Sequence, residues 1–162
     1  MPAHGQLRSL YVTDDATDMD KAYSAVVWTT TADLVKVPTT TIEVTDTRRE
    51  AQSATDASDV DVSYLGSRSV SFTVGVESLV TGDTDAAKLI LLDAYQEGTE
   101  IGCFFVFGAN AVTDATKATH HGYWCKCRVR ECPRSATNDN VISTNYVLVP
   151  SDPAKFEDVQ PA

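Results

Sequence analysis

Cysteines and histidines are the residues of this sequence best suited to chemistry. Their densest stretch holds two adjacent histidines and a C-x-C-x4-C pattern: His120, His121, Cys125, Cys127 and Cys132. Structural zinc sites usually take their thiolates from C-x2-C turns. Cys125 and Cys127 instead have the spacing of residues on one face of a strand, about 6.5 Å apart. This spacing favours small buried side chains, so we expect neither a bound metal nor a structural disulfide.

A cysteine–histidine nucleophile pair is the second chemistry that these residue types allow. Cys103 lies in the most apolar segment of the chain, where forming a thiolate is costly. His4, like the other two histidines, lies in a segment typical of a loop or strand entry, and no motif places an orienting acid beside it. The glycines are scattered singly and form no phosphate loop. Without an assembled catalytic set or a cofactor motif, we expect a protein that is not an enzyme.

The composition is that of a single acidic globular domain. The chain of 162 residues is 43% hydrophobic and 22% charged, with a net charge of −10. This charge repels polyanions and argues against sequence-specific DNA binding. No apolar run approaches a membrane span, and the first ten residues have no signal-peptide core. We therefore expect one domain over residues 1–162, with no membrane partner, synthesised in the cytoplasm with reduced cysteines.

Segments rich in valine, isoleucine, threonine and aromatic residues predict the strands. They are residues 6–13, 22–29, 33–45, 62–77, 100–108, 121–132 and 141–149. From Val70 to Val76 every second residue is apolar, which is typical of a half-buried antiparallel strand. Residues 100–108 are apolar almost throughout, as in a strand buried on both faces. Pro38 predicts a bend or an edge position.

One segment, residues 83–97, has the pattern of a helix. Asp83 is the expected N-cap, and Gly98 stands where a left-handed C-terminal cap belongs. The apolar stripe consists of Ala86, Ala87, Leu89, Ile90, Leu91 and Ala94. A helix with one stripe packs on one sheet. We therefore expect a mainly β protein, an antiparallel β-sandwich or barrel-like subunit with one flanking helix.

Two stretches fall outside this pattern of strands and helix. Residues 46–61 have Val60 as their only large apolar residue, which predicts a long polar loop. We expect this loop to be mobile in the free subunit and ordered by a neighbour, because it buries too little apolar surface to offset its own ordering entropy. Residues 151–162 are expected to form an extended C-terminal tail.

Taken in order, these elements resemble the major tail tube protein of long-tailed bacteriophages. Three stretches carry the resemblance: residues 28–45 (WTTTADLVKVPTTTIEVT), residues 67–84 with the helix that follows (SRSVSFTVGVESLVTGDT, then DAAKLILLDAYQEG), and residues 100–149 with the closing NYVLVPSD. The resemblance implies a β-sandwich-like or barrel-like subunit flanked by a helix. The same fold family includes the tubes of contractile tails and of type VI secretion systems.

The resemblance also implies a structural virion protein of the phage tail, synthesised in the host cytoplasm. Six copies would join their sheets into a ring, and stacked rings would form a tube that delivers DNA into the host. The expected partners are further copies of itself, the tail-tip or initiator and tail-terminator proteins, the tape measure protein in the lumen, and DNA passing without sequence-specific binding. Open sheet edges suit such assembly, because a neighbouring strand satisfies their backbone groups.

Charged residues in two places are the candidate contacts between subunits. Those of the polar loop are Asp46, Arg48, Arg49, Glu50, Asp56, Asp59 and Asp61. Those of the strand at 121–132 are Lys126, Arg128 and Arg130. The second set alternates with Cys127 and Val129, so we expect it to face the outer surface or a neighbour's acids. A cation in the lumen would hold the DNA backbone, whereas an acidic lumen would repel it.

Two other functions remain open on the sequence. A capsid decoration protein or another β-sandwich binding module would recognise a ligand with its loops and exist as a monomer or trimer. A small cysteine- or zinc-dependent enzyme would require a pocket with titratable groups. Size-exclusion chromatography and electron microscopy distinguish the first from a tube, and a metal assay tests the second.

Overall fold

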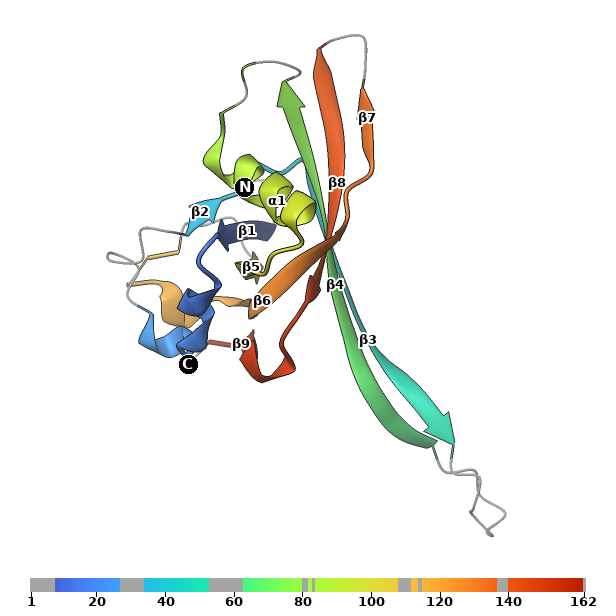
Figure 1. Ribbon diagram of the computed structural model, residues 1–162. Coiled ribbons are helices and arrows are strands. Elements are labelled where there is room, and N and C mark those ends of the chain that lie inside the picture. The colour runs from blue at the N-terminus through green and yellow to red at the C-terminus, as the bar shows by residue number, and fades with distance from the viewer. Residues whose placement is uncertain are drawn as a thin grey trace, which may run out of the picture.

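The described part of the chain forms one antiparallel sheet and one α-helix, seen in the computed structural model of Figure 1. The structure describes residues 8–26, 34–52, 63–79, 82, 84–107, 112–113, 115–136 and 140–161, with the backbone alone at 49–52 and 63–67. The strands are β1 (Arg8–Thr13), β2 (Val35–Lys36), β3 (Thr41–Gln52), β4 (Ser63–Leu79), β5 (Ile101–Phe107), β6 (His121–Glu131), β7 (Arg134–Ala136), β8 (Val141–Pro150) and β9 (Phe156–Val159). The helix α1 spans Ala86–Glu97, and the 3-10 turns are η1 (Ala16–Asp20), η2 (Tyr23–Ala25), η3 (Lys117–Thr119) and η4 (Pro153–Lys155). The predicted mainly β fold with one flanking helix is confirmed.

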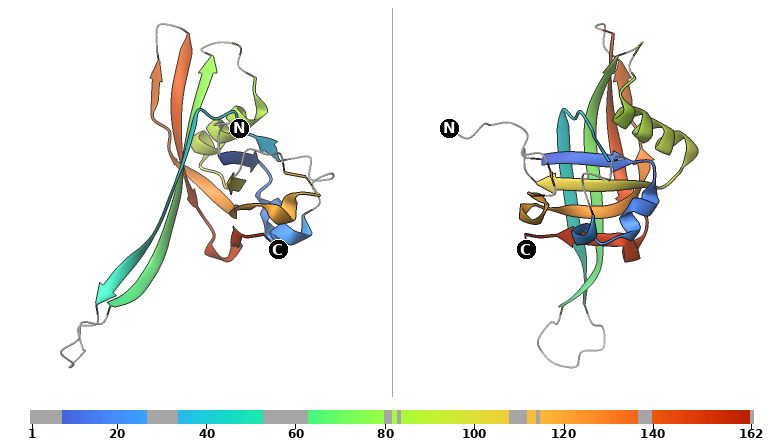
Figure 2. Two further views of the ribbon diagram at one scale, coloured as in Figure 1. Left: turned by 180° about the vertical axis from the view of Figure 1, so that it is seen from behind. Right: turned by 90° about the vertical axis from the view of Figure 1, so that its left-hand side faces the viewer.

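Strand β6 joins two halves of this sheet. Along one edge it pairs with β5, and along the other it pairs first with β9 and then with β8. We call β2, β1, β5, β9 and the first part of β6 the β5 half, and the last part of β6 with β7, β8, β4 and β3 the β4 half. The right-hand view of Figure 2 shows the strands of the β5 half running across those of the β4 half.

The main core lies between the two halves. Phe72 of β4 stacks on Phe105 of β5 with 5.3 Å between the ring centroids. Leu10 of β1 and Leu148 of β8 belong to the same buried cluster. The predicted apolar face at positions 70, 72, 74 and 76 is buried here, which confirms the alternation read from the sequence. A sheet folded onto itself in this way has the predicted sandwich-like arrangement.

A second buried cluster covers the outer face of the β5 half. Phe104 and Trp124 lie on that face with 5.7 Å between their ring centroids, and Tyr23 packs against Phe104 at 4.9 Å. This cluster explains why β5 is buried on both faces, as predicted. The strand predicted at residues 22–29 is wrong, because η2 forms there and its apolar side chains cover a sheet instead of extending one. The last three residues of that segment lie outside the described residues.

Helix α1 begins later than predicted. Its N-cap is Asp85, whose side chain accepts a hydrogen bond from the Lys88 backbone N–H at 3.1 Å, and Asp83 lies outside the described residues. Gly98 ends the helix with a left-handed φ of 67°, as predicted. The buried face is narrower than the predicted stripe and consists of Ala87, Leu91 and Ala94. The remaining predicted members are the exposed Ala86 and Leu89 and the half-buried Ile90.

No helix in the described ranges is long and apolar enough to cross a membrane.

Strands β3 and β4 form a long hairpin that projects from the body of the protein (Figures 1 and 2). The loop predicted at residues 46–61 is therefore too long, because 46–52 belong to β3 and pair with β4. Residues 53–61 lie outside the described part of the chain. The prediction failed because a strand needs an apolar face only where it covers a core. Here Asp46, Thr47 and Arg48 are exposed.

The C-terminal segment at 151–162, predicted as an extended tail, is built into the sheet. Strand β9 pairs antiparallel with the first part of β6, and η4 connects it to β8. Val159 is buried in the second cluster. Four residues are too few to show an alternating pattern, so this strand was not visible in the sequence.

Truncating Leu91 tests the assigned face of α1. Leu91 is fully buried, so Leu91→Ala is expected to lower the free energy of unfolding by about 2–5 kcal/mol. The matched control on the same helix is Leu89→Ala, which removes a side chain that is 45% exposed. It should change the same quantity by less than about 0.5 kcal/mol. Urea unfolding followed by circular dichroism measures both, and equal losses would contradict this packing.

Candidate functional site

Arg68 is the centre of a charged network at the root of the long hairpin. From β4, its guanidinium donates to both carboxylate oxygens of Asp46 on β3, at 2.8 and 2.5 Å. It also donates to both carboxylate oxygens of Asp158 on β9, at 2.6 and 2.8 Å. The Tyr123 hydroxyl of β6 donates to Asp46 Oδ2 at 3.0 Å. The network, named here after Arg68, therefore connects the hairpin to two strands of the β5 half.

The arginine fits this position because of its shape as well as its charge. Its guanidinium carbon lies 5.1 Å from the centre of the Phe156 ring and 5.9 Å from that of Tyr123. A planar guanidinium can bind two carboxylates in a bidentate manner while resting against aromatic rings, which a lysine ammonium cannot do. The contacts of Arg68 thus combine ionic, hydrogen-bonding and cation–π attraction.

The electrostatics of the network favour its charged form. The hydrogen bond from Arg68 holds the pKa of Asp46 below its ordinary value, and the Tyr123 hydroxyl adds to this effect. The hydrogen bonds to Asp46 and Asp158 raise the pKa of Arg68. Burial, followed by the nearby Asp46, raises the pKa of Tyr123. The Arg68 and Asp46 side chains are 26% and 28% exposed. Water therefore screens this ion pair, and its contribution to the free energy of unfolding is modest.

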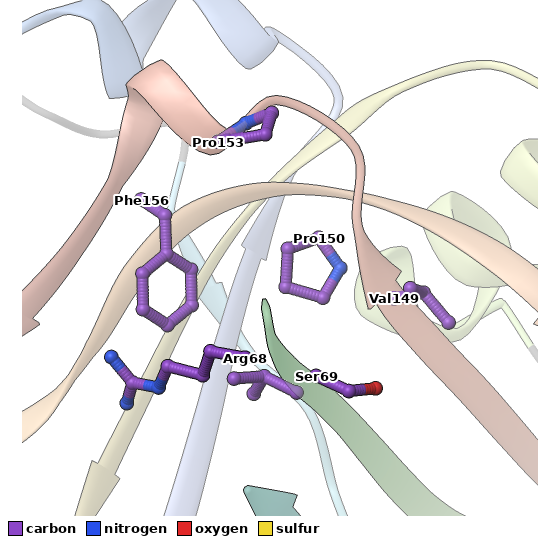
Figure 3. A pocket seen from close by; sticks show the side chains of 7 residues that line it. Arg68, Ser69, Val149, Pro150, Pro153 and Phe156 are labelled. Carbon is purple, nitrogen blue, oxygen red and sulfur yellow. The ribbon is translucent and has the colours of Figure 1, made fainter. Parts of the chain in front are cut away.

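An open hollow of about 280 Å³ adjoins the network (Figure 3). Its lining is mostly apolar and comes from β4, the end of β8, η4 and β9: Arg68, Ser69, Val70, Val149, Pro150, Pro153 and Phe156. Figure 3 shows the Arg68 side chain extending beside the Phe156 ring at its rim. Among the lining residues that the structure describes, the Ser69 hydroxyl is the one possible nucleophile and none is a general base, so the hollow is suited to apolar contact.

The structure places only part of the predicted loop contacts. Asp46 and Arg48 are exposed on β3, and Asp46 reaches Tyr123 rather than the basic residues of β6. The others fall where no side chain is described: Arg49 and Glu50 on β3, and Asp56, Asp59 and Asp61 beyond the described residues. Their role in contacts between subunits stays a prediction.

The three basic residues of β6 have different partners within the subunit. The Lys126 ammonium lies 2.8 Å from Asp20 of η1 and 4.0 Å from Glu100, and the hydrogen bond to Asp20 raises the pKa of Lys126. Arg128 donates to the backbone carbonyl of Gly98. The remaining cation, Arg130, is 60% exposed and lies 3.8 Å from Glu131. Lys126 and Arg128 are thus held by groups of their own chain, and both arginines are exposed.

Three of the four cysteines are buried in the core, as expected, whereas Cys132 is half-buried against it. Cys103, Cys125 and Cys127 are fully buried in the main core, and the sulfur atoms of the last two lie 3.4 Å apart. Burial raises the pKa of Cys127, which keeps its thiol protonated. His120, which directly precedes β6, is also buried, and burial lowers its pKa. Within the described ranges, no three cysteine, histidine, aspartate or glutamate side chains are grouped as metal ligands would be.

Sequence reasoning named Asp46 but missed Arg68 and Asp158. The signal that the sequence offers is the two-residue repeat of a strand, in which every second side chain lies on the same face. Arg68 is two positions before the buried Val70, and Asp46 is two positions after Val44. Arg68 and Asp46 therefore lie on the same strand faces as these apolar residues, at the point where the core ends. Charged side chains at such a point are expected to pair with each other. No comparable signal marked Asp158, because its strand was not predicted.

Comparison with known proteins shows that this chain has the fold of some solved structures, and it shows nothing beyond the fold. No protein-family model and no curated protein matches the chain. The SPP1 tail tube, determined by solid-state NMR and cryo-EM, is 15% identical and aligns with 99% of this chain and 81% of its own at a TM-score of 0.65. A chain of the tail of the empty gene transfer agent particle, refined with C6 symmetry, is 8% identical and aligns over 98% of both chains at 0.58. A chain of the native gene transfer agent virion, 8% identical, aligns with 74% of this chain and 85% of its own at 0.54.

Removing the Asp46 carboxylate tests the network through its pH dependence. Because the folded pKa of Asp46 lies below its unfolded value, its contribution is present above about pH 4 and is lost as the pH falls through the folded pKa. We expect Asp46→Asn to lower the free energy of unfolding by about 1 kcal/mol at pH 7 and by less at each step below pH 4.

Urea unfolding of wild type and variant between pH 7 and pH 3 measures this difference. Asp93→Asn, which changes an exposed acid on α1, is the matched control and should stay within about 0.5 kcal/mol of wild type throughout. A loss for Asp46→Asn that does not shrink in acid would show that the carboxylate acts through its shape and not its charge.

Proposed function

We propose that this chain, which has the tail-tube fold, is a structural subunit of a phage-type tail tube. Copies of it join into rings, the rings stack, and the tube conducts DNA toward the host. The observation that carries the proposal is the fold likeness to the SPP1 tail tube, which extends over 99% of the chain. Such a protein acts by assembly and positioning, and it requires no catalytic group.

Unpaired sheet edges support self-association. Within the described residues, β3 pairs with β4 alone and β7 pairs with β8 alone, so both ends of the β4 half present open backbone groups. Near the start of β3, the Arg8 side chain donates a hydrogen bond to the backbone carbonyl of Ile42 at 2.9 Å. The strand continues past Ile42 as far as Gln52. A strand from a neighbour satisfies such edges. Pairing the β3 edge of one copy with the β7 edge of the next would be a head-to-tail contact, which either closes into a ring or continues as a helix.

The same likeness supports a proposed number of subunits in the ring, and the partners are proposed from the sequence resemblance. The tail of the empty gene transfer agent particle was refined with C6 symmetry, and we propose six copies per ring here. The tube would be part of the virion, begin on a tail-tip or initiator protein, end at a terminator and hold a tape measure protein. A net charge of −10 suits a conduit that DNA must pass without binding.

The long hairpin is the proposed contact with a neighbouring subunit or ring. It projects from the body, as Figure 1 shows, and its direction is set where it leaves the core. The Arg68 network lies at that point and ties both hairpin strands to β9. Loss of the network would leave the subunit folded while changing the angle at which the hairpin reaches its neighbour.

Assembly of the purified protein tests the proposed function. Sedimentation velocity and negative-stain microscopy over a range of concentrations, with and without a tail-tip template, should show sixfold rings or tubes. A protein that stays monomeric on the template would contradict the proposal.

A variant in which residues 53–61 are replaced by a short Asn-Gly turn separates the hairpin end from the rest of the fold. We expect it to fold as wild type does by circular dichroism but to form no tubes, because the inter-subunit contact is removed. Normal tubes from this variant would show that the segment is only a spacer.

A further inference from the structure

The outer edge of β3 is tied to β1 where the strand begins. Within the described residues, β3 pairs with β4 along its other edge only. Just before β3, the Val37 backbone N–H donates to the carbonyl of Leu10 on β1 at 2.8 Å. At Ile42, near the start of β3, the backbone carbonyl accepts a hydrogen bond from Arg8 Nη1 at 2.9 Å. The right-hand view of Figure 2 shows β1 running across β3 at this point.

The Arg8 side chain reaches β3 from the other half of the sheet. Leu10 and Val12 follow Arg8 at steps of two residues and are fully buried in the main core, so the three side chains lie on the same face of β1. Arg8 itself is exposed, because the core ends there. Its guanidinium therefore bridges the β5 half and the β4 half at the margin of the main core.

A basic side chain in this position replaces a paired strand. An edge carbonyl is a hydrogen-bond acceptor that a strand of another chain can use, and proteins protect such edges with long charged side chains. Here the donor to Ile42 carries a positive charge, and hydrogen bonds from charged donors are stronger than those between neutral groups. The start of the β3 edge is thus occupied by a group of its own chain.

We propose that Arg8 guards the β3 edge: in the free subunit its guanidinium holds the place beside Ile42 that a strand of a second copy would take. Copies join at this point only after Arg8 is released. The inference rests on the proposed function and adds a control on when the copies assemble. One junction between two free copies gains little to offset the release, whereas a growing end offers a joining copy further contacts. The guard therefore delays the first ring more than it slows growth.

A guard and a purely structural bridge differ in the direction of their effect on assembly. When a contact that only stabilises the subunit is lost, the melting temperature falls and the folded subunits associate no faster. When a guard is lost, the edge carbonyl becomes available, and folded subunits associate sooner.

Arg8→Met tests the guard, because methionine keeps an unbranched side chain while removing the donor and the charge. Light scattering at one protein concentration, without a template, measures the lag before assembly. The lag of Arg8→Met should be at least about tenfold shorter than that of wild type, the change expected when a hydrogen bond from a charged donor is lost.

Two controls separate the guard from charge and from stability. Lys36→Met removes one positive charge from the exposed face of the neighbouring strand β2 and should keep the wild-type lag. Leu91→Ala lowers stability at a remote site on α1 and, at a temperature where it is folded, should keep the wild-type lag too. A wild-type lag for Arg8→Met, or an equally short lag for either control, would show that Arg8 is not a guard.

Sedimentation velocity separates failure of the guard from failure of the tube function. If wild type stays monomeric even on a tail-tip template, the proposed function fails. In that case the guard is still supported if Arg8→Met self-associates while wild type and both controls remain monomeric. It is wrong if Arg8→Met remains monomeric as well.

Discussion

The structure depends on the way in which β6 satisfies its backbone hydrogen bonds. A buried strand must pair its N–H and C=O groups on both edges. Strand β6 meets this requirement with β5 on one side and with β9 and then β8 on the other. Because β9 and β8 follow different directions, the sheet divides there, and its two halves face each other across the main core. The sandwich-like shape thus results from one strand with three neighbours.

The division also determines where the chain can be polar. The β5 half is covered on both sides, by the main core and by the cluster around Trp124, so β5 is apolar on both faces. The β4 half has a core on one side only, and its strands continue past that core into the hairpin. Where the core ends, Arg68 and two aspartates replace apolar packing with charged contacts. Each half therefore has the composition that its surroundings require.

Most of the strands could be predicted from the sequence, because each alternates or is apolar throughout. The helix was found from its stripe and from Gly98, although Asp85 and not Asp83 caps it. The wrong predictions share one cause. A local pattern of residues does not reveal which distant segment packs against or pairs with it. Tyr23 covers a sheet face, and residues 46–52 form a strand without a core beneath them. The partnership of Arg68 with Asp158 joins segments far apart in the chain, so spacing could not show it.

The order of strands has a consequence for how the chain folds. Strand β5 is the most apolar segment, yet its neighbour β1 lies far earlier in the sequence, and β6, the strand on its other side, follows a long connection. Contacts between distant segments form slowly, because loop closure costs entropy before any packing is gained. Until β1 and β6 arrive, the edges of β5 are exposed and prone to pair with other chains. Folding of this protein is therefore expected to be slow, and the nascent chain is expected to benefit from a chaperone that shields β5.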